Sequence, residues 1–247
     1  MPDWTTWAIL LGSAFVPPFL WLLVIRNTER YGREPMGRVF RAFFWGAVVA
    51  VIVAIVISLL VVAVVLPKAE PLYEFLGQRG LSDPALLLSV LIVAPFVEEF
   101  AKALGVLRVR RFLKEPEDGL VYGASAGLGF AATENLFYGL SALVASQSLT
   151  TSILVIGVRS VSSALLHASA TASTGYGLGK SRLWGQSAIP WYLLAVLMHA
   201  TFNLFASFGV LLTATLGDWA GLIGLLAAIV FAGIAFVLVR QKIREKD

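Results

Sequence analysis

The most informative stretch of this chain is Ala94-Pro95-Phe96-Val97-Glu98-Glu99-Phe100-Ala101-Lys102, around which the rest is organised. Two adjacent carboxylates and a lysine lie inside a segment that is otherwise apolar enough to cross a membrane. A charged side chain at the centre of a bilayer costs at least about 2.5–3.5 kcal/mol. Such residues therefore need polar partners, and the segment predicts a helix that turns a polar site toward the inside of a helix bundle.

The composition around this stretch is that of an integral membrane protein. Of the 247 residues, 58% are hydrophobic and only 14% are charged, compared with about a quarter charged in a soluble domain. The absence of cysteine excludes disulfides and thiolate metal sites. We expect residues 1–247 to form a single membrane domain that is all-α, since a helix satisfies its own backbone hydrogen bonds in lipid.

Seven segments reach the roughly 20 apolar residues that a spanning helix needs. The first one follows a start that lacks a basic region and a cleavage site, so we read it as a retained helix. Segments three to six carry the chemistry and make up residues 85–212. The seven predicted spans are 4–25, 39–66, 85–107, 120–145, 151–179, 189–212 and 216–239.

The basic residues predict the orientation of the chain in the membrane. Fifteen of the 19 Lys and Arg residues lie in the first, third and fifth loops and in the C-terminal tail. Because cytoplasmic loops are enriched in these residues, we expect the N-terminus outside and the C-terminus in the cytoplasm. The net charge of +4 is thereby explained by topology, and we predict no binding of nucleic acid.

Glu98, Glu99 and Lys102 can pair on one face of the third predicted helix. Glu98 and Lys102 are four residues apart and Glu99 and Lys102 are three apart, and both spacings allow contact. One lysine neutralises only one carboxylate. The second carboxylate is therefore available for chemistry, as a general base or as a metal ligand.

Further polar residues occupy the next three predicted spans. Adjacent helices run in opposite directions, yet the glutamates and both histidines fall about midway along their own spans. Four antiparallel helices therefore place these groups in one layer. Asn203 shares a helix face with one histidine and could orient it or bind an oxyanion. The residues are Glu134 and Asn135 in 120–145, Arg159 and His167 in 151–179, and His199 and Asn203 in 189–212.

This cluster fits hydrolysis in two ways. A carboxylate can take a proton from water while a histidine or an asparagine stabilises the oxyanion. Alternatively, Glu98, His167 and His199 can hold zinc, because two histidines and a glutamate are a ligand set of catalytic zinc sites. The same residue types would also serve a proton-coupled transporter.

Four motifs on successive predicted helices resemble those of the PrsW family of intramembrane proteases. They are Glu98-Glu99-x-x-Lys102, Phe130-x-x-x-Glu134-Asn135, His167, and His199-x-x-x-Asn203. The resemblance covers about residues 85–210. The PrsW family is similar to the CAAX prenyl proteases and, more remotely, to the scaffold subunit of gamma-secretase.

The resemblance implies an endopeptidase that cleaves membrane-anchored proteins, often anti-sigma or other regulatory factors. By position, Glu98 and Glu99 become the main catalytic candidates, and Glu134, His167 and His199 complete the site. Lys102, Asn135, Arg159 and Asn203 support it. The CAAX prenyl proteases have histidine at the position of Glu134, which argues against processing of prenylated peptides here.

Two other functions remain open at this point. A non-catalytic scaffold like the gamma-secretase subunit keeps intramembrane histidines, although it needs no spare carboxylate. A proton-coupled transporter often has paired, interrupted segments in matching halves, and this sequence shows none. PrsW-type proteins are often called metalloproteases, but zinc and a glutamate-activated water without metal both fit the resemblance.

Overall fold

The computed structural model describes residues 3–30, 32–78 and 83–245. These residues form helices and turns and contain no strand, as predicted. Seven helical stretches in this part of the chain are long and apolar enough to span a membrane, and they confirm the predicted number. Their bounds are Trp4–Arg26, Met36–Val64, Pro84–Phe112, Asp118–Ser146, Leu149–Trp184, Ile189–Ala206 and Trp219–Arg244.

Several of these stretches consist of more than one helix. The second contains α2 (Met36–Phe44), the π-helical turn η1 (Trp45–Ala50) and α3 (Val51–Val64). The third contains α5 (Pro84–Leu88), the π-helical turn η3 (Ser89–Val93), α6 (Ala94–Val109) and the 3₁₀ turn η4 (Arg110–Phe112). The other spanning helices are α1 (Trp4–Arg26), α7 (Asp118–Ser146), α8 (Leu149–Val161), α9 (Ser163–Trp184), α10 (Ile189–Ala206) and α13 (Trp219–Arg244).

The fifth predicted helix, 151–179, is broken in the structure. Ser162 has φ −120° and ψ −80°, which ends α8 and starts α9. The hydroxyls of Ser160 and Ser162 donate to the carbonyls of Ile156 and Val158, four residues back. Serine hydroxyls that bond in this way loosen and bend a helix. The prediction of one continuous helix over 151–179 was therefore wrong, because the chain forms two helices there.

The sixth predicted helix is shorter than expected. We predicted it to residue 212, but α10 ends at Ala206 and is followed by the short helices α11 (Phe208–Leu211) and α12 (Thr213–Leu216). The backbone N–H and the hydroxyl of Ser207 both donate to the carbonyl of Asn203. Apolar composition alone does not reveal such an end, because the residues beyond it are equally apolar.

The backbones of α7 and α9 lie in direct contact, as the glycine spacing on these helices suggests. A Cβ atom added at Gly127 would lie 2.1 Å from the carbonyl oxygen of His167. One added at Gly119 would lie equally close to the carbonyl oxygen of Gly175. Nearly all of the first half of α7 is buried, so this helix forms the centre of the bundle.

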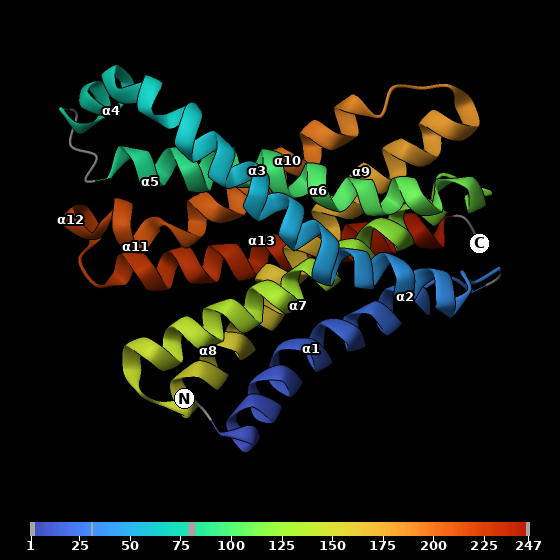
Figure 1. Ribbon diagram of the computed structural model, residues 1–247. Helices are drawn as coiled ribbons and strands as arrows, with labels where there is room; N and C mark the ends of the chain where they lie inside the picture. The colour runs from blue at the N-terminus through green and yellow to red at the C-terminus, as the bar shows by residue number, and fades with distance from the viewer. Residues whose placement is uncertain (1–2, 31, 79–82, 246–247) are drawn as a thin grey trace.

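The loops that carry most of the basic residues gather at one end of the bundle, on the right in Figure 1, where the C-terminus also lies. We call this the basic end. The opposite end carries the α7–α8 turn, α11, α12 and the short helices η2 (Leu66–Ala69) and α4 (Glu70–Gly77). The segregation of charge matches the pattern from which the orientation was predicted.

Candidate active site

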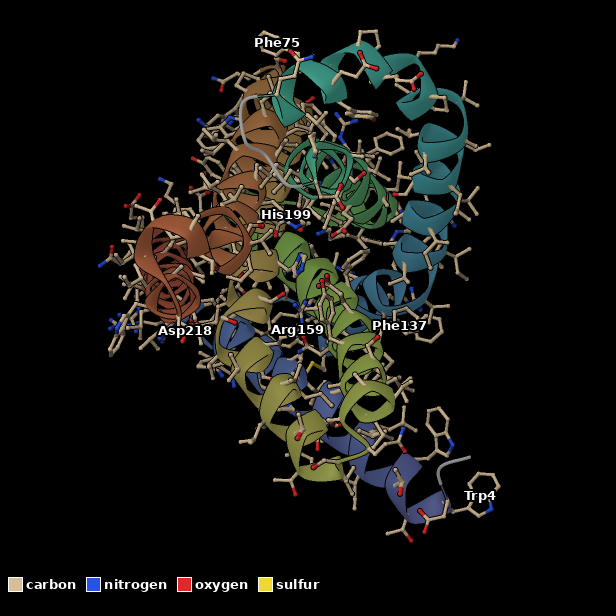
Figure 2. All side chains as sticks on the ribbon, turned by 90° about the vertical axis from the view of Figure 1, so that its left-hand side faces the viewer. Trp4, Phe75, Phe137, Arg159, His199 and Asp218 are labelled. Atoms are coloured by element: carbon tan, nitrogen blue, oxygen red, sulfur yellow. The ribbon has the colours of Figure 1, made fainter. Side chains whose placement is uncertain are left out.

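The predicted site residues from α6, α7, α8, α9 and the middle of α10 meet inside the bundle. His199 and Arg159 lie near the middle of Figure 2, whereas Trp4, Phe75 and Asp218 lie at its periphery. Helix direction alternates through the bundle, so groups midway along each helix reach the same layer. The contacts within this layer form a continuous ionic network.

Glu99 is completely buried and accepts hydrogen bonds from three helices. Its Oε1 lies 2.7 Å from Lys102 Nζ and 3.0 Å from His199 Nδ1. Its Oε2 accepts a hydrogen bond of 2.8 Å from Thr171 Oγ1. Because both oxygens accept hydrogen bonds and the side chain is completely buried, Glu99 orients its neighbours and lies away from the space that a substrate could enter.

Glu98 has a different environment from its neighbour. Its Oε2 lies 3.6 Å from Lys102 Nζ and 3.8 Å from His199 Nε2, which are ion-pair distances too long for hydrogen bonds. This oxygen is buried and accepts no hydrogen bond from the residues that the structure describes. The side chain of Glu98 is 16% exposed, whereas that of Glu99 is 0% exposed. Glu98 is therefore the carboxylate that Lys102 leaves available.

His167 bridges the two halves of the network. Its Nδ1 lies 2.9 Å from Lys102 Nζ and its Nε2 lies 2.8 Å from Glu134 Oε2. An ammonium group only donates, so Nδ1 accepts and Nε2 carries the proton that is donated to Glu134. The ring meets that of His199 edge to face, with 4.8 Å between centroids.

Arg159 holds Glu134 and Asn135 at the outer side of the network. Its Nη2 lies 2.7 Å from Glu134 Oε2, and its Nε donates to Asn135 Oδ1 at 3.0 Å. Nη2 also donates to Ser163 Oγ, and the guanidinium lies 3.7 Å from the centroid of the Tyr138 ring. The break at Ser162 separates Arg159 and Ser163 between two helices, and this bond links α8 to α9.

Asn203 lies apart from these groups. Its Nδ2 donates to the carbonyl of Val90 in the π-helical turn η3, at 2.9 Å. The structure therefore shows no contact in which Asn203 orients an imidazole, although it shares a face of α10 with His199. Its amide joins α10 to the third span.

Two further residues, Thr171 and Phe130, contact the network but were not predicted as site residues. Thr171 Oγ1 bonds to Glu99, and Lys102 Nζ lies 4.4 Å from the centroid of the Phe130 ring. Thr171 could have been found, because it lies four residues after His167 on the same helix face. Phe130 begins one of the four motifs, but its contact with Lys102 was not predicted, since a buried aromatic residue is ordinary in a membrane helix.

A cavity of about 280 Å³ adjoins the network. Glu98 and Glu134 line it together with Phe137 and apolar residues of α3. Beyond Ala54, α3 has no buried residue among those described, so it covers this side only loosely. Figure 2 shows Phe137 on the side of α7 that faces α3. The cavity therefore connects the carboxylates with the lipid between these two helices.

Glu98, His167 and His199 each offer one donor atom, and these atoms lie within 4.8 Å of one another. The donor set suits zinc, and the Glu99–His199 contact is of the kind that orients a metal-bound imidazole. The Oε2 of Glu98 supports the fit, because it accepts no hydrogen bond from the described residues. His167 could join only after releasing Lys102 or Glu134, since both of its nitrogens are engaged. The residues present can thus bind a metal ion.

The comparisons with known proteins agree with this geometry. The model of the PrsW family intramembrane metalloproteases matches residues 34–238. This chain belongs to the PrsW family. Protease PrsW of Clostridioides difficile (strain 630) is 28% identical over 200 residues, which cover 77% of this chain and 76% of the relative. Protease PrsW of Bacillus subtilis (strain 168) is 28% identical over 211 residues, which cover 85% of each chain.

Protease PrsW of Geobacillus kaustophilus (strain HTA426) is 26% identical over 198 residues, which cover 76% of this chain and 77% of the relative. No solved structure matches this chain. The resemblance to PrsW proteins predicted from the motifs is confirmed. The chain is an intramembrane endopeptidase and a multi-pass protein of the cell membrane.

Proposed function

We propose that Glu98 activates the water that attacks the peptide bond and that Glu99 positions His199. The observation that carries this assignment is the contrast between the two glutamates. Glu98 lines the cavity and has an oxygen without a hydrogen bond from the described residues, whereas both oxygens of Glu99 are occupied. A general base must reach the proton that it abstracts, and of these two glutamates Glu98 is the one that lines the cavity.

The remaining groups support this reaction. As the oxygen of water bonds to the carbonyl carbon, Glu98 takes the proton from the water. The same carboxyl then returns the proton to the amine nitrogen as the carbon–nitrogen bond breaks. Ionised Glu99 accepts the Nδ1 proton of His199, which turns the lone pair of Nε2 toward Glu98. Arg159 and Glu134 hold His167, so its ring keeps a fixed orientation beside His199.

We further propose zinc as the metal, with His199, a released His167 and one oxygen of Glu98 as its ligands. The second oxygen of Glu98 would then remain available as the base. A bound zinc ion would polarise the peptide carbonyl and lower the pKa of water. Glu99 would then act on the imidazole of His199 from outside the coordination shell, and Lys102 would keep Glu99 ionised. This assignment follows from the donor types and their separation.

The proposed substrate is a membrane-anchored protein that reaches Glu98 from the lipid between α3 and α7. The apolar residues of α3 and Phe137 would contact its transmembrane segment. Family resemblance points to regulatory proteins of the anti-sigma type. We propose a single membrane domain with the N-terminus outside, which places the basic end in the cytoplasm.

The first experiment measures new protein N-termini in membranes of cells that express the wild-type chain or Glu98→Gln. We expect cleavage products of membrane-anchored proteins that appear with the wild type only. Zinc per purified chain is measured beside it, and we expect about one equivalent that His199→Ala loses. Wild-type products without zinc in folded protein would eliminate the metal assignment, and products that persist in Glu98→Gln would eliminate Glu98 as the base.

A further inference from the structure

A second cavity lies away from the active site, between α9, α10 and α13. Its volume is about 500 Å³, within the roughly 300–1,000 Å³ of small-molecule sites. Its walls are almost entirely apolar or aromatic. Ile234 and Leu238 on its border are more than half exposed, so the cavity is a groove that opens toward lipid.

The groove has the length of one leaflet of a bilayer. On α13 its lining runs from Phe231 to Lys242, which is a rise of about 16 Å at 1.5 Å per residue. Half of the hydrocarbon core of a bilayer is about 15 Å. Met198 lines the groove near mid-depth and Trp191 lies closer to the basic end, where α10 begins. An extended acyl chain of one leaflet matches this length.

The basic end of the groove carries two lysines around one aromatic ring. Lys180 Nζ lies 4.9 Å and Lys242 Nζ lies 5.6 Å from the centroid of the Tyr176 ring. Lys180 also lies 4.9 Å from the Trp191 ring. Among the described residues no carboxylate lies within 4.0 Å of Lys180, whereas Lys242 pairs with Glu117 and Glu245.

Because Lys242 already pairs with two carboxylates, Lys180 supplies the positive charge beside this ring that an anion would neutralise. Tyrosine and tryptophan are also the residues that lie at the level of lipid headgroups. The groove thus combines an apolar channel of leaflet length with a cationic, aromatic mouth. An anionic phospholipid has two parts that match these features, an acyl chain for the apolar channel and a phosphate for the cationic end.

We propose that this groove binds one anionic glycerophospholipid from the leaflet at the basic end. The acyl chain lies along α13 down to Phe231, and the phosphate lies between Lys180 and Lys242. The inner end touches the catalytic helices, since Ser173 Oγ on α9 donates to Met198 Sδ and Met198 precedes His199. The proposal does not rest on the assignment of the catalytic residues.

A transmembrane helix of a second copy is the alternative occupant. It would bury the apolar walls, but it brings no anion to the two lysines. Another apolar cavity, of about 360 Å³ and lined by Phe15, Phe19, Phe40 and Phe43, offers the matched comparison. No basic residue lines it, so we expect no headgroup preference there.

The test titrates the purified protein with phosphatidylglycerol or phosphatidylcholine of identical chains and counts bound lipids by native mass spectrometry. We expect one tightly retained phosphatidylglycerol. Lys180→Gln with Lys242→Gln lowers its affinity roughly tenfold, because each interfacial lysine attracts the headgroup. The control is Lys114→Gln with Arg244→Gln, which removes the same charge from exposed positions and leaves retention unchanged.

A second pair of variants tests the channel. Ala235→Phe fills the groove and abolishes retention, whereas Gly233→Phe, on the same helix with open space around it, does not. A phospholipid with a photoreactive acyl chain should label residues 231–242 of the wild-type protein. This measurement does not depend on the folding of any variant. Equal retention of both lipids, retention that survives Ala235→Phe, or a protein dimer that Ala235→Phe dissociates would overturn the proposal.

Discussion

Two buried clusters of acidic residues can be compared in the part of the chain that the structure describes, and one of them has the features of an active site. The first is the ionic network around Glu98 and Glu99. The second, at the basic end, consists of Glu29, Glu34 and Asp118, whose carboxylates also approach within 4.8 Å of one another. By proximity and burial alone the two clusters look equally suited to chemistry.

The groups that bind the carboxylates distinguish the two clusters. At the basic end Glu29 Oε2 accepts from the backbone N–H of Glu34, and Asp118 Oδ2 accepts from the N–H groups of Lys114 and Glu115. Tyr122 donates to Glu34. These contacts fasten loops to the start of α7.

The network around Glu98 is instead made of side chains that can exchange protons, and it borders a cavity. Backbone donors satisfy a carboxylate permanently, whereas imidazoles and an ammonium group leave room for proton transfer. The cavity and the two imidazoles therefore distinguish the cluster around Glu98 from the cluster at the basic end.

The largest expected contrast comes from removing one carboxylate in each cluster. Glu98→Gln should lower kcat/KM for the cleaved membrane protein at least about 100-fold, the scale of a general base, and leave thermal unfolding nearly unchanged. Asp118→Ala should instead lower stability and leave kcat/KM nearly unchanged, because the N–H groups of Lys114 and Glu115 lose their acceptor, each bond contributing about 1 kcal/mol. If Asp118→Ala abolished turnover in folded protein, the assignment of the basic-end cluster to structure would be wrong.

Substitutions at two close contacts between α7 and α9 should show a smaller contrast, because one contact lies beside the active site and the other lies near the basic end. Gly127→Ala drives a methyl group into the backbone of His167, and Gly119→Ala drives one into that of Gly175. Both should cost about 1–3 kcal/mol of unfolding free energy. Only Gly127→Ala should also lower kcat, because it displaces His167. Gly157→Ala is the control, since nothing lies within 4 Å of the added carbon.

Single hydroxyl groups should give the smallest effects. Thr171→Val deletes the hydrogen bond to Glu99 and should lower kcat about three- to tenfold, since the bond contributes roughly 1 kcal/mol. Tyr122→Phe deletes the bond to Glu34 and should lower stability by a similar free energy without changing kcat. Steady-state kinetics and thermal unfolding of both variants check this. Equal kinetic effects would show that the clusters are coupled.

Much of the candidate site could be predicted, because placing a charged side chain in lipid costs free energy whatever the fold of the chain. Glu98, Glu99, Glu134, His167 and His199 were recognised by depth, and the structure brings them together. Their individual roles were beyond prediction. Lys102 can reach either glutamate by spacing, and its closer pairing with Glu99 depends on Thr171 and His199 from other helices.

Hydrophobicity and charge along the chain were enough to predict the seven spans, the basic end, the layer of polar residues and the family. These properties follow from the hydrophobicity of each segment and the position of each charge, which need no knowledge of neighbours. The break at Ser162, the separation of Asn203 from the network, the basic-end cluster and the groove along α13 became visible in three dimensions alone. Each of these depends on which atoms from distant segments come within a few ångströms, because hydrogen bonds and packing act only at contact.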